Sequence, residues 1–215
     1  MSSIISKYKK QIQGLKPLED SKFRYDSNRW SKLNTIAKKS VLVFENKEIA
    51  RKDVIKAFEE YFQGSESYLY PFTLTMIWGF ADTGYGTFRT NKYLSSNENK
   101  AFIKSAFNEI IAGDISNAYH LLMKVNGLNV SYISKLLYFG TKARKQLHYA
   151  LIFDIRVARS LVKISDLEGF SGFLNISPSN KYEDYNGYNM LIHRWAKELK
   201  VKAENIEMFL FNGDF

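Results

Sequence analysis

Hydrophobic residues recur at helical spacing through most of the 215-residue chain, with charged residues between them. The pattern predicts helices starting near 28 and over 47–62, 67–80, 97–111, 115–125, 130–139, 154–163, 182–200 and 203–211. Glycine-rich or polar segments predict a loop at 79–86, a tight turn at 126–129 and a basic loop at 140–146. We therefore predict a nearly all-α protein, either one domain or two small helical lobes that share a core.

Composition excludes several functional classes. No segment approaches the roughly 20 apolar residues that span a bilayer, and the N-terminus lacks the apolar region of a signal peptide. The sequence has no cysteine, which excludes disulfides, thiol nucleophiles, zinc–thiolate sites and iron–sulfur clusters. The three histidines are far apart, so no metal site is predicted.

Positive charge is concentrated in two regions. The formal net charge is +9, with +7 in residues 1–39 and +6 in residues 135–163. Two basic regions in an otherwise slightly acidic chain indicate a polyanionic partner, of which nucleic acid is the usual example. Solvated lysines on an ordinary surface are the alternative. We describe residues 1–27 as a basic lead-in and residues 28–215 as a single domain.

The turn at 126–129 joins two predicted helices. Gly127 and Asn129 are residue types that tolerate positive φ, and such a turn directs backbone N–H groups outward, as a phosphate site requires. An ordinary helical hairpin is the alternative. In the following helix, Lys135 lies on the face with Ser131, opposite the apolar face. A partly desolvated lysine has a lowered pKa and becomes a nucleophile, whereas a surface lysine extends its charge into water.

Asp154 is the only acidic residue among residues 135–163. It follows an apolar run and precedes a helix, which is typical of an N-cap residue. Capping and catalysis are compatible, since a capping carboxylate is held in place in its ionised form. On the helix that follows, Arg156, Arg159 and Lys163 share one face, which suits a cleft that receives DNA.

These segments resemble the helix–hairpin–helix DNA glycosylase superfamily. The run Gly127-Leu128-Asn129-Val130-Ser131 resembles the phosphate-gripping hairpin, although Asn126 and Asn129 stand where proline and glycine are common. Phe153-Asp154-Ile155-Arg156-Val157-Ala158-Arg159 resembles the segment that carries the catalytic aspartate. Lys135 lies one helical turn beyond the usual lysine position, Ser131, as in the archaeal 8-oxoguanine glycosylase branch and in bacterial proteins of that fold.

Two aromatic segments support the same branch. Residues 76–89, with Trp78-Gly79 and Gly84-Tyr85-Gly86, resemble a region of the bacterial group, and so does the ending with Tyr185, Trp195-Ala196, Glu207 and Leu210-Phe211. The resemblance implies an all-α fold with two helical lobes around a cleft. It implies a base pocket for which Trp30, Trp78 and Tyr85 are candidates, with core packing as the alternative role.

The resemblance implies a DNA glycosylase with AP-lyase activity that flips and excises a damaged or modified base such as 8-oxoguanine. Lys135 would form a Schiff base and Asp154 would stabilise positive charge on the sugar, without a metal or other cofactor. The expected DNA contacts are Gly127, Leu128, Asn129, Ser131, Lys142, Arg144, Arg156 and Arg159. We expect a monomeric, cytoplasmic protein, associated with the nucleoid when bound to DNA and independent of membranes. The alternatives are a non-catalytic DNA-binding module of this fold and a defence protein that acts on modified phage DNA.

Overall fold

The protein is mainly helical. The computed structural model describes residues 3–81, 83–165, 177–213 and 215, and in these ranges it has thirteen α-helices, one short 3-10 helix and one two-stranded sheet. The all-α prediction is therefore confirmed. Within the same ranges, no helix combines the length and apolar character needed to cross a membrane.

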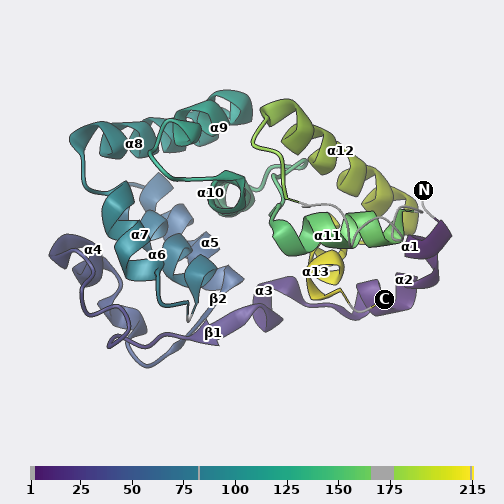
Figure 1. Cartoon of the computed structure of the whole chain (residues 1–215), viewed down its shortest axis with the longest axis horizontal. Helices are drawn as coiled ribbons and strands as arrows, with labels where there is room; N and C mark the ends of the chain where they lie inside the picture. Colours follow the sequence, from purple (N-terminus) through teal and green to yellow (C-terminus); the bar gives the residue numbers. More distant parts are fainter. Residues whose placement is uncertain (1–2, 82, 166–176, 214) are drawn as a thin grey trace.

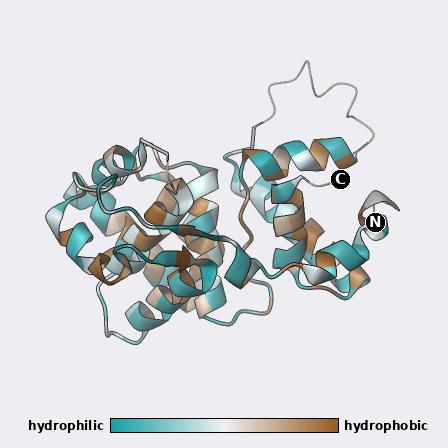
Figure 2. Cartoon of the chain, turned by 90° about the horizontal axis from the view of Figure 1, so that it is seen from below, coloured by the Kyte–Doolittle hydropathy of each residue, from teal (hydrophilic) through white to brown (hydrophobic). Residues whose placement is uncertain are grey.

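The helices form two groups with α10 (Val130–Ala143) between them (Figure 1). Figure 2, seen from below, shows the same two groups, with hydrophobic and hydrophilic segments alternating along their helices. The first group contains α4 (Thr35–Ser40), the 3-10 helix (Leu42–Phe44), α5 (Arg51–Phe62), α6 (Leu69–Phe80), α7 (Gly86–Tyr93), α8 (Asn97–Ala112) and α9 (Ile115–Met123). The second contains α11 (Ile155–Ile164), α12 (Tyr182–Leu199), α13 (Ala203–Asn212) and the N-terminal helices α1 (Ser3–Lys7) and α2 (Lys9–Gly14). Two lobes thus meet along one central helix.

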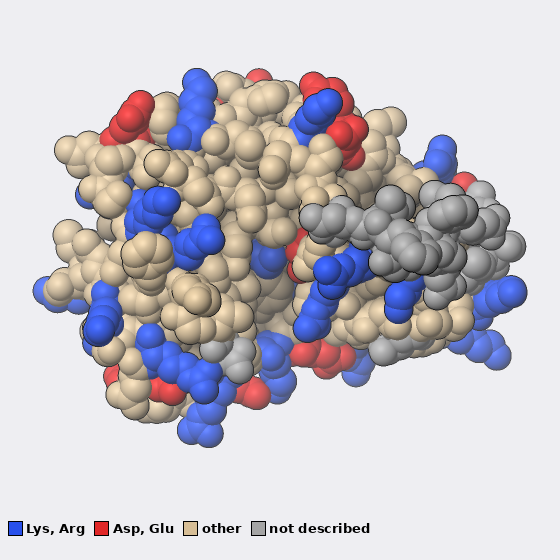
Figure 3. Space-filling view, in the orientation of Figure 1, with Lys and Arg blue, Asp and Glu red and all other residues tan. Residues whose placement is uncertain are grey.

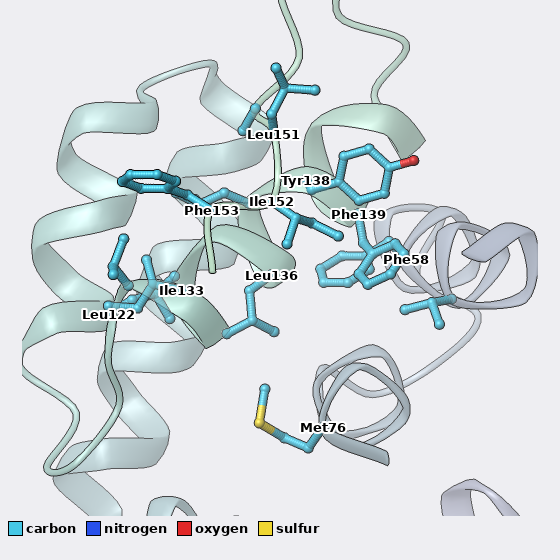
Figure 4. Close-up of a cluster of buried hydrophobic side chains, with 14 of the residues drawn as sticks. Phe58, Met76, Leu122, Ile133, Leu136, Tyr138, Phe139, Leu151, Ile152 and Phe153 are labelled. Atoms are coloured by element: carbon cyan, nitrogen blue, oxygen red, sulfur yellow. The ribbon is translucent and has the colours of Figure 1, made fainter. Parts of the chain in front are cut away.

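A cluster of buried hydrophobic side chains surrounds α10 (Figure 4). Ile133, Leu136 and Leu137 are fully buried, as their shared helical face predicts. Leu151 and Ile152 of the segment before α11 pack into the same cluster. Because α10 is buried along most of its length, side chains on it have little freedom to move.

The N-terminal lead-in is folded onto the second lobe. Ile5 and Ile12 are fully buried, and Asn205 of α13 donates hydrogen bonds to the carbonyls of Ile12 and Leu15, both at 3.0 Å. The chain continues through α3 (Pro17–Asp20) to strand β1 (Lys22–Arg24), which pairs antiparallel with β2 (Glu48–Ala50). Apolar residues spaced between the lysines explain this packing, so the basic segment forms part of the fold.

Several predicted boundaries differ from the structure. The helix expected near residue 28 begins at Thr35, because turns occupy the preceding residues. The loop expected at 79–86 is shorter, because α6 continues to Phe80 and α7 begins at Gly86. Most of the basic loop expected at 140–146 is helical, because α10 continues to Ala143. The predicted helices at 67–80, 115–125 and 154–163 correspond to α6, α9 and α11.

Candidate active site

A cleft of about 590 Å³ opens between the two lobes at the N-terminal end of α10. Figure 3 shows this face hollowed at its centre, with both basic and acidic side chains in the hollow. Its lining comes from elements far apart in the sequence, including Trp78, Gly79, Tyr132, Lys135, Asp154, Arg156, Glu207 and Phe211. The two lobes therefore bring the predicted lysine and aspartate into one cavity.

Lys135 reaches the cleft from the second turn of α10. Its side chain is 8% exposed, and its Nζ lies 3.0 Å from the Ser131 carbonyl and 3.8 Å from Oδ2 of Asp154. Burial lowers the pKa of Lys135, while the negative charges of Asp154 and Glu207 oppose that shift. The outcome is a lysine that loses its proton more readily than a lysine in water.

Asp154 uses its two carboxylate oxygens differently. Oδ1 accepts the N–H groups of Arg156 at 3.0 Å and Val157 at 3.3 Å, which caps α11, while Oδ2 faces Lys135. Both predicted roles, the cap and the partner of Lys135, are therefore geometrically compatible in one side chain.

The segment that delivers Asp154 is held along α10 by hydroxyl groups. Ser134 Oγ accepts the N–H of Phe153 at 3.0 Å, and Thr141 Oγ1 accepts the N–H of Ala150 at 2.9 Å. On the other side, the hydroxyls of Tyr185 and Tyr188 donate to the carbonyls of Leu151 and Ile152, at 2.9 and 2.8 Å. These bonds satisfy buried backbone groups and fix the aspartate against the lysine.

Gly79 provides the space for the lysine. A Cβ at this position would lie 3.0 Å from Cδ of Lys135 and 3.3 Å from a ring carbon of Tyr132. The Tyr132 ring stacks on Phe80 at 4.3 Å and lies 5.2 Å from the Lys135 amine. Gly79 therefore contributes to the site by having no side chain, which leaves room for Lys135 and Tyr132.

A buried ion pair lies at the base of the cleft. Arg51 donates to both oxygens of Glu207, at 2.6 and 3.3 Å, and both side chains are almost completely inaccessible. The Arg51 guanidinium also lies over the rings of Trp78 and Tyr138. Sequence reasoning missed Arg51, because an arginine at the start of an amphipathic helix resembles an ordinary solvated residue.

The hairpin before α10 differs in part from the prediction. Gly127 has φ of +83°, as expected, but Asn129 has φ of −122° and does not require a glycine. The N–H of Val130 donates to Oδ1 of Asn180 at 3.2 Å. One amide of the proposed phosphate site therefore has an internal partner. Leu128 is buried, whereas Asn129 and Ser131 line the cleft.

The three aromatic candidates have different locations. Trp78 lines the cleft, and its indole N–H donates to the carbonyl of Ser21 at 3.0 Å. Trp30 is only 2% exposed and packs against Gly86, where an added Cβ would approach its ring to 2.6 Å. Tyr85 is 75% exposed just before α7. Trp30 therefore belongs to the core and Tyr85 to the surface, and neither lines the cleft.

The four predicted basic contacts also separate. Arg156 and Arg159 are exposed on α11, and Arg156 lines the cleft with its guanidinium over Phe211. Lys142 instead pairs with the buried Glu204 at 3.2 Å, and Arg144 is exposed at the opposite end of α10 from the hairpin. Of the four, Arg156 alone lines the cleft, whereas Lys142 and Arg144 lie away from it.

Among the comparisons with known proteins, the chain matches a protein-family model. No curated protein and no solved structure matches the chain significantly. A family model described as "Putative 8-oxoguanine DNA glycosylase OGG-like protein" matches residues 16–211, which span both lobes and every residue of the cleft named above. The chain therefore belongs to this OGG-like family.

Proposed function

We propose that the protein is a DNA glycosylase with AP-lyase activity that removes an oxidised or otherwise modified base. The observation that carries this proposal is the buried Lys135 amine, 3.8 Å from the Asp154 carboxylate in the cleft between the lobes. Membership of the OGG-like family supports DNA as the partner.

The proposed chemistry begins with a nucleotide rotated out of the duplex into the cleft. The neutral Lys135 amine attacks the sugar carbon C1′, and the bond to the base breaks. The base departs with the bonding electrons and gains a proton. Asp154 stabilises the positive charge that develops on the sugar. The nitrogen of the new C–N bond gives up a proton, which supplies the one that the departing base gains. The C1′–O4′ bond then breaks and O4′ takes a proton from water, which gives a protonated Schiff base; removal of a C2′ proton then expels the 3′-phosphate.

Burial of Lys135 favours catalysis over simple DNA binding. Basic side chains that only contact phosphates are typically exposed to water. Arg156, Arg159 and Lys163 on α11 are exposed in this way. Removing a charged amine from water costs several kcal/mol. A non-catalytic module would gain nothing from that cost, whereas a nucleophile requires the lowered pKa that burial produces.

Borohydride trapping tests the proposal directly. Reduction of the Schiff base should link the wild-type protein covalently to duplex DNA that contains an abasic site. Lys135→Gln should give no adduct and bind the same DNA nearly unchanged. The matched control is Lys163→Gln, which removes an exposed lysine from α11 and should retain trapping.

A panel of duplexes with 8-oxoguanine or other modified bases then identifies the excised base. Adducts with Lys135→Gln would show that the nucleophile is another residue. Absence of adducts with the wild-type protein on every substrate would refute the lyase chemistry.

A further inference from the structure

An exposed stripe of aromatic and basic side chains runs along the first lobe beside the cleft. Tyr85, the residue just before α7, and Phe88 are 75% and 67% exposed, and helical spacing places Phe88 on one face of α7 with the exposed Arg89 and Lys92. Two large aromatic side chains exposed within one helical turn of each other give this surface apolar area that a ligand could cover. Their combination with two cations distinguishes this face from a protein–protein patch, whose centre is depleted of charge.

The loop before α4 adds two further cations. The Arg29 carbonyl accepts from Thr87 Oγ1 at 3.0 Å, and the Lys32 carbonyl accepts from Asn91 Nδ2 at 2.8 Å, so this loop is fastened along α7. The side chains of Arg29 and Lys32 are exposed, and Arg29 also pairs with Asp26 at 3.6 Å. The basic N-terminal region therefore reaches the same surface. We call Tyr85, Phe88, Arg89, Lys92, Arg29 and Lys32 the basic–aromatic face.

This face is continuous with the candidate active site. At one end, Ala81 and Thr83 line the cleft just before Tyr85. At the other end, an added Cβ at Gly127 would lie 3.6 Å from the Lys92 amine, so Lys92 adjoins the hairpin. Figure 3 shows basic side chains over the part of the surface where Figure 1 places α7.

We propose that the basic–aromatic face binds a stretch of DNA whose bases are unpaired, adjacent to the nucleotide in the cleft. The cations would contact phosphates, and Tyr85 and Phe88 would stack on bases. The proposal rests on the proposed function only in taking DNA as the partner; it does not depend on Lys135 chemistry.

Stacking explains why two aromatic rings are exposed together. Residues three apart on a helix are separated by roughly 4.5 Å along its axis. That separation is comparable to the spacing of nucleotides along one strand, about 3.4 Å when stacked. Paired bases hide their faces in the duplex, so these rings can stack only on bases that are unpaired. DNA with a bubble or a single strand is therefore the preferred ligand.

Fluorescence anisotropy tests the proposal with three probes: a single strand, a fully paired duplex and the same duplex with a central bubble. Tyr85→Ala/Phe88→Ala should weaken binding of the single strand and the bubble by about tenfold or more, since base–aromatic stacking contributes about 1–3 kcal/mol per base. Affinity for the paired duplex should change by less than about twofold, because its phosphate contacts remain. The control Tyr85→Phe/Phe88→Tyr retains both rings and should bind like the wild type.

The outcomes separate this proposal from the proposed function. Equal loss on all three probes, or no loss on any, would overturn the stacking role. If this face instead bound a second copy of the protein, the double alanine variant would bind all three DNA probes like the wild type. That result would overturn the proposal as well. Absence of borohydride adducts combined with a selective loss on unpaired DNA would refute the glycosylase chemistry and leave the basic–aromatic face supported.

Discussion

Gly79→Ala tests whether α6 positions the proposed nucleophile. The added Cβ would lie 3.0 Å from Cδ of Lys135 and 3.3 Å from Cε1 of Tyr132. Because carbon atoms pack comfortably at about 3.5–4.0 Å, the Lys135 side chain must retreat by about 0.5–1 Å. The side chain is nearly buried, so this movement displaces the amine from its position facing Asp154.

The size of the effect follows from that displacement. A misplacement of about 1 Å can cost about 10²-fold in rate, so we expect trapping to slow by about 10- to 100-fold. The free energy of unfolding should fall by about 0–2 kcal/mol, because alanine is favoured over glycine in a helix by about 1 kcal/mol and crowding costs about 1–3 kcal/mol. Affinity for DNA should remain near the wild-type value, since no charge is altered.

Single-turnover borohydride trapping on abasic DNA measures the rate, and a thermal melt monitors the fold. Gly187→Ala on α12 is the matched control, because an added Cβ there meets no atom within 4 Å. This control should trap at the wild-type rate. A folded Gly79→Ala protein that also traps at the wild-type rate would refute the proposed position of the reacting amine.

Three further substitutions examine other parts of the site. Asp154→Asn preserves the helix cap but removes the charge, so base release should slow by about 10²-fold or more in a single-turnover excision assay. Burial lowers the pKa of Lys135 and Asp154 opposes that shift. Trapping should therefore rise as pH passes this pKa, and in Asp154→Asn the rise should occur at lower pH; an unchanged profile would contradict the electrostatic coupling. Arg51→Met leaves Glu207 buried without its partner and should lower the free energy of unfolding by about 3–5 kcal/mol in urea, whereas Arg51→Met/Glu207→Leu should restore most of it. Gly127→Val opposes a φ of +83° and should weaken binding to all DNA sequences alike by anisotropy; normal affinity with lost base preference would exclude the backbone-positioning role.

Elements with a local signal were predictable from the sequence. Asp114 caps α9 by accepting the N–H of Asn117, and Asp154 caps α11 in the same way, so both helices begin where the polar residue indicates. The Lys135–Asp154 pair was expected from the resemblance to the glycosylase superfamily, since the residues alone left a surface lysine and a simple helix cap as alternatives. The structure places the two side chains 3.8 Å apart, and their catalytic roles remain proposals.

Features that depend on distant contacts were not predictable. Helix α7 was missed because no element was predicted between the loop expected at 79–86 and the helix expected at 97–111; the helix begins at Gly86, where the Trp30 ring packs. Arg51 and Glu207 are 156 residues apart, and only the tertiary fold shows that they pair. Tyr85 illustrates the opposite error: an aromatic residue in a suggestive segment was expected in the pocket but is exposed. Side-chain direction at a helix start depends on neighbours that a single sequence does not reveal.

The charges in the cleft suit a reaction that begins with a neutral amine. Lys22 and Arg156 line the cleft from exposed positions, whereas Lys135, Arg51, Asp154 and Glu207 are largely shielded from water, and two positive and two negative charges balance in these four groups while Lys135 is protonated. When Lys135 loses its proton, these four residues together carry a net charge of −1. Because burial excludes water, this negative charge is little screened. It therefore stabilises the positive charge that develops on the sugar in the transition state. The exposed arginines of α11 can attract phosphates without disturbing this balance, since solvent screens them. Separating exposed cations from the buried cluster thus allows one cleft both to attract a polyanion and to stabilise a cationic transition state.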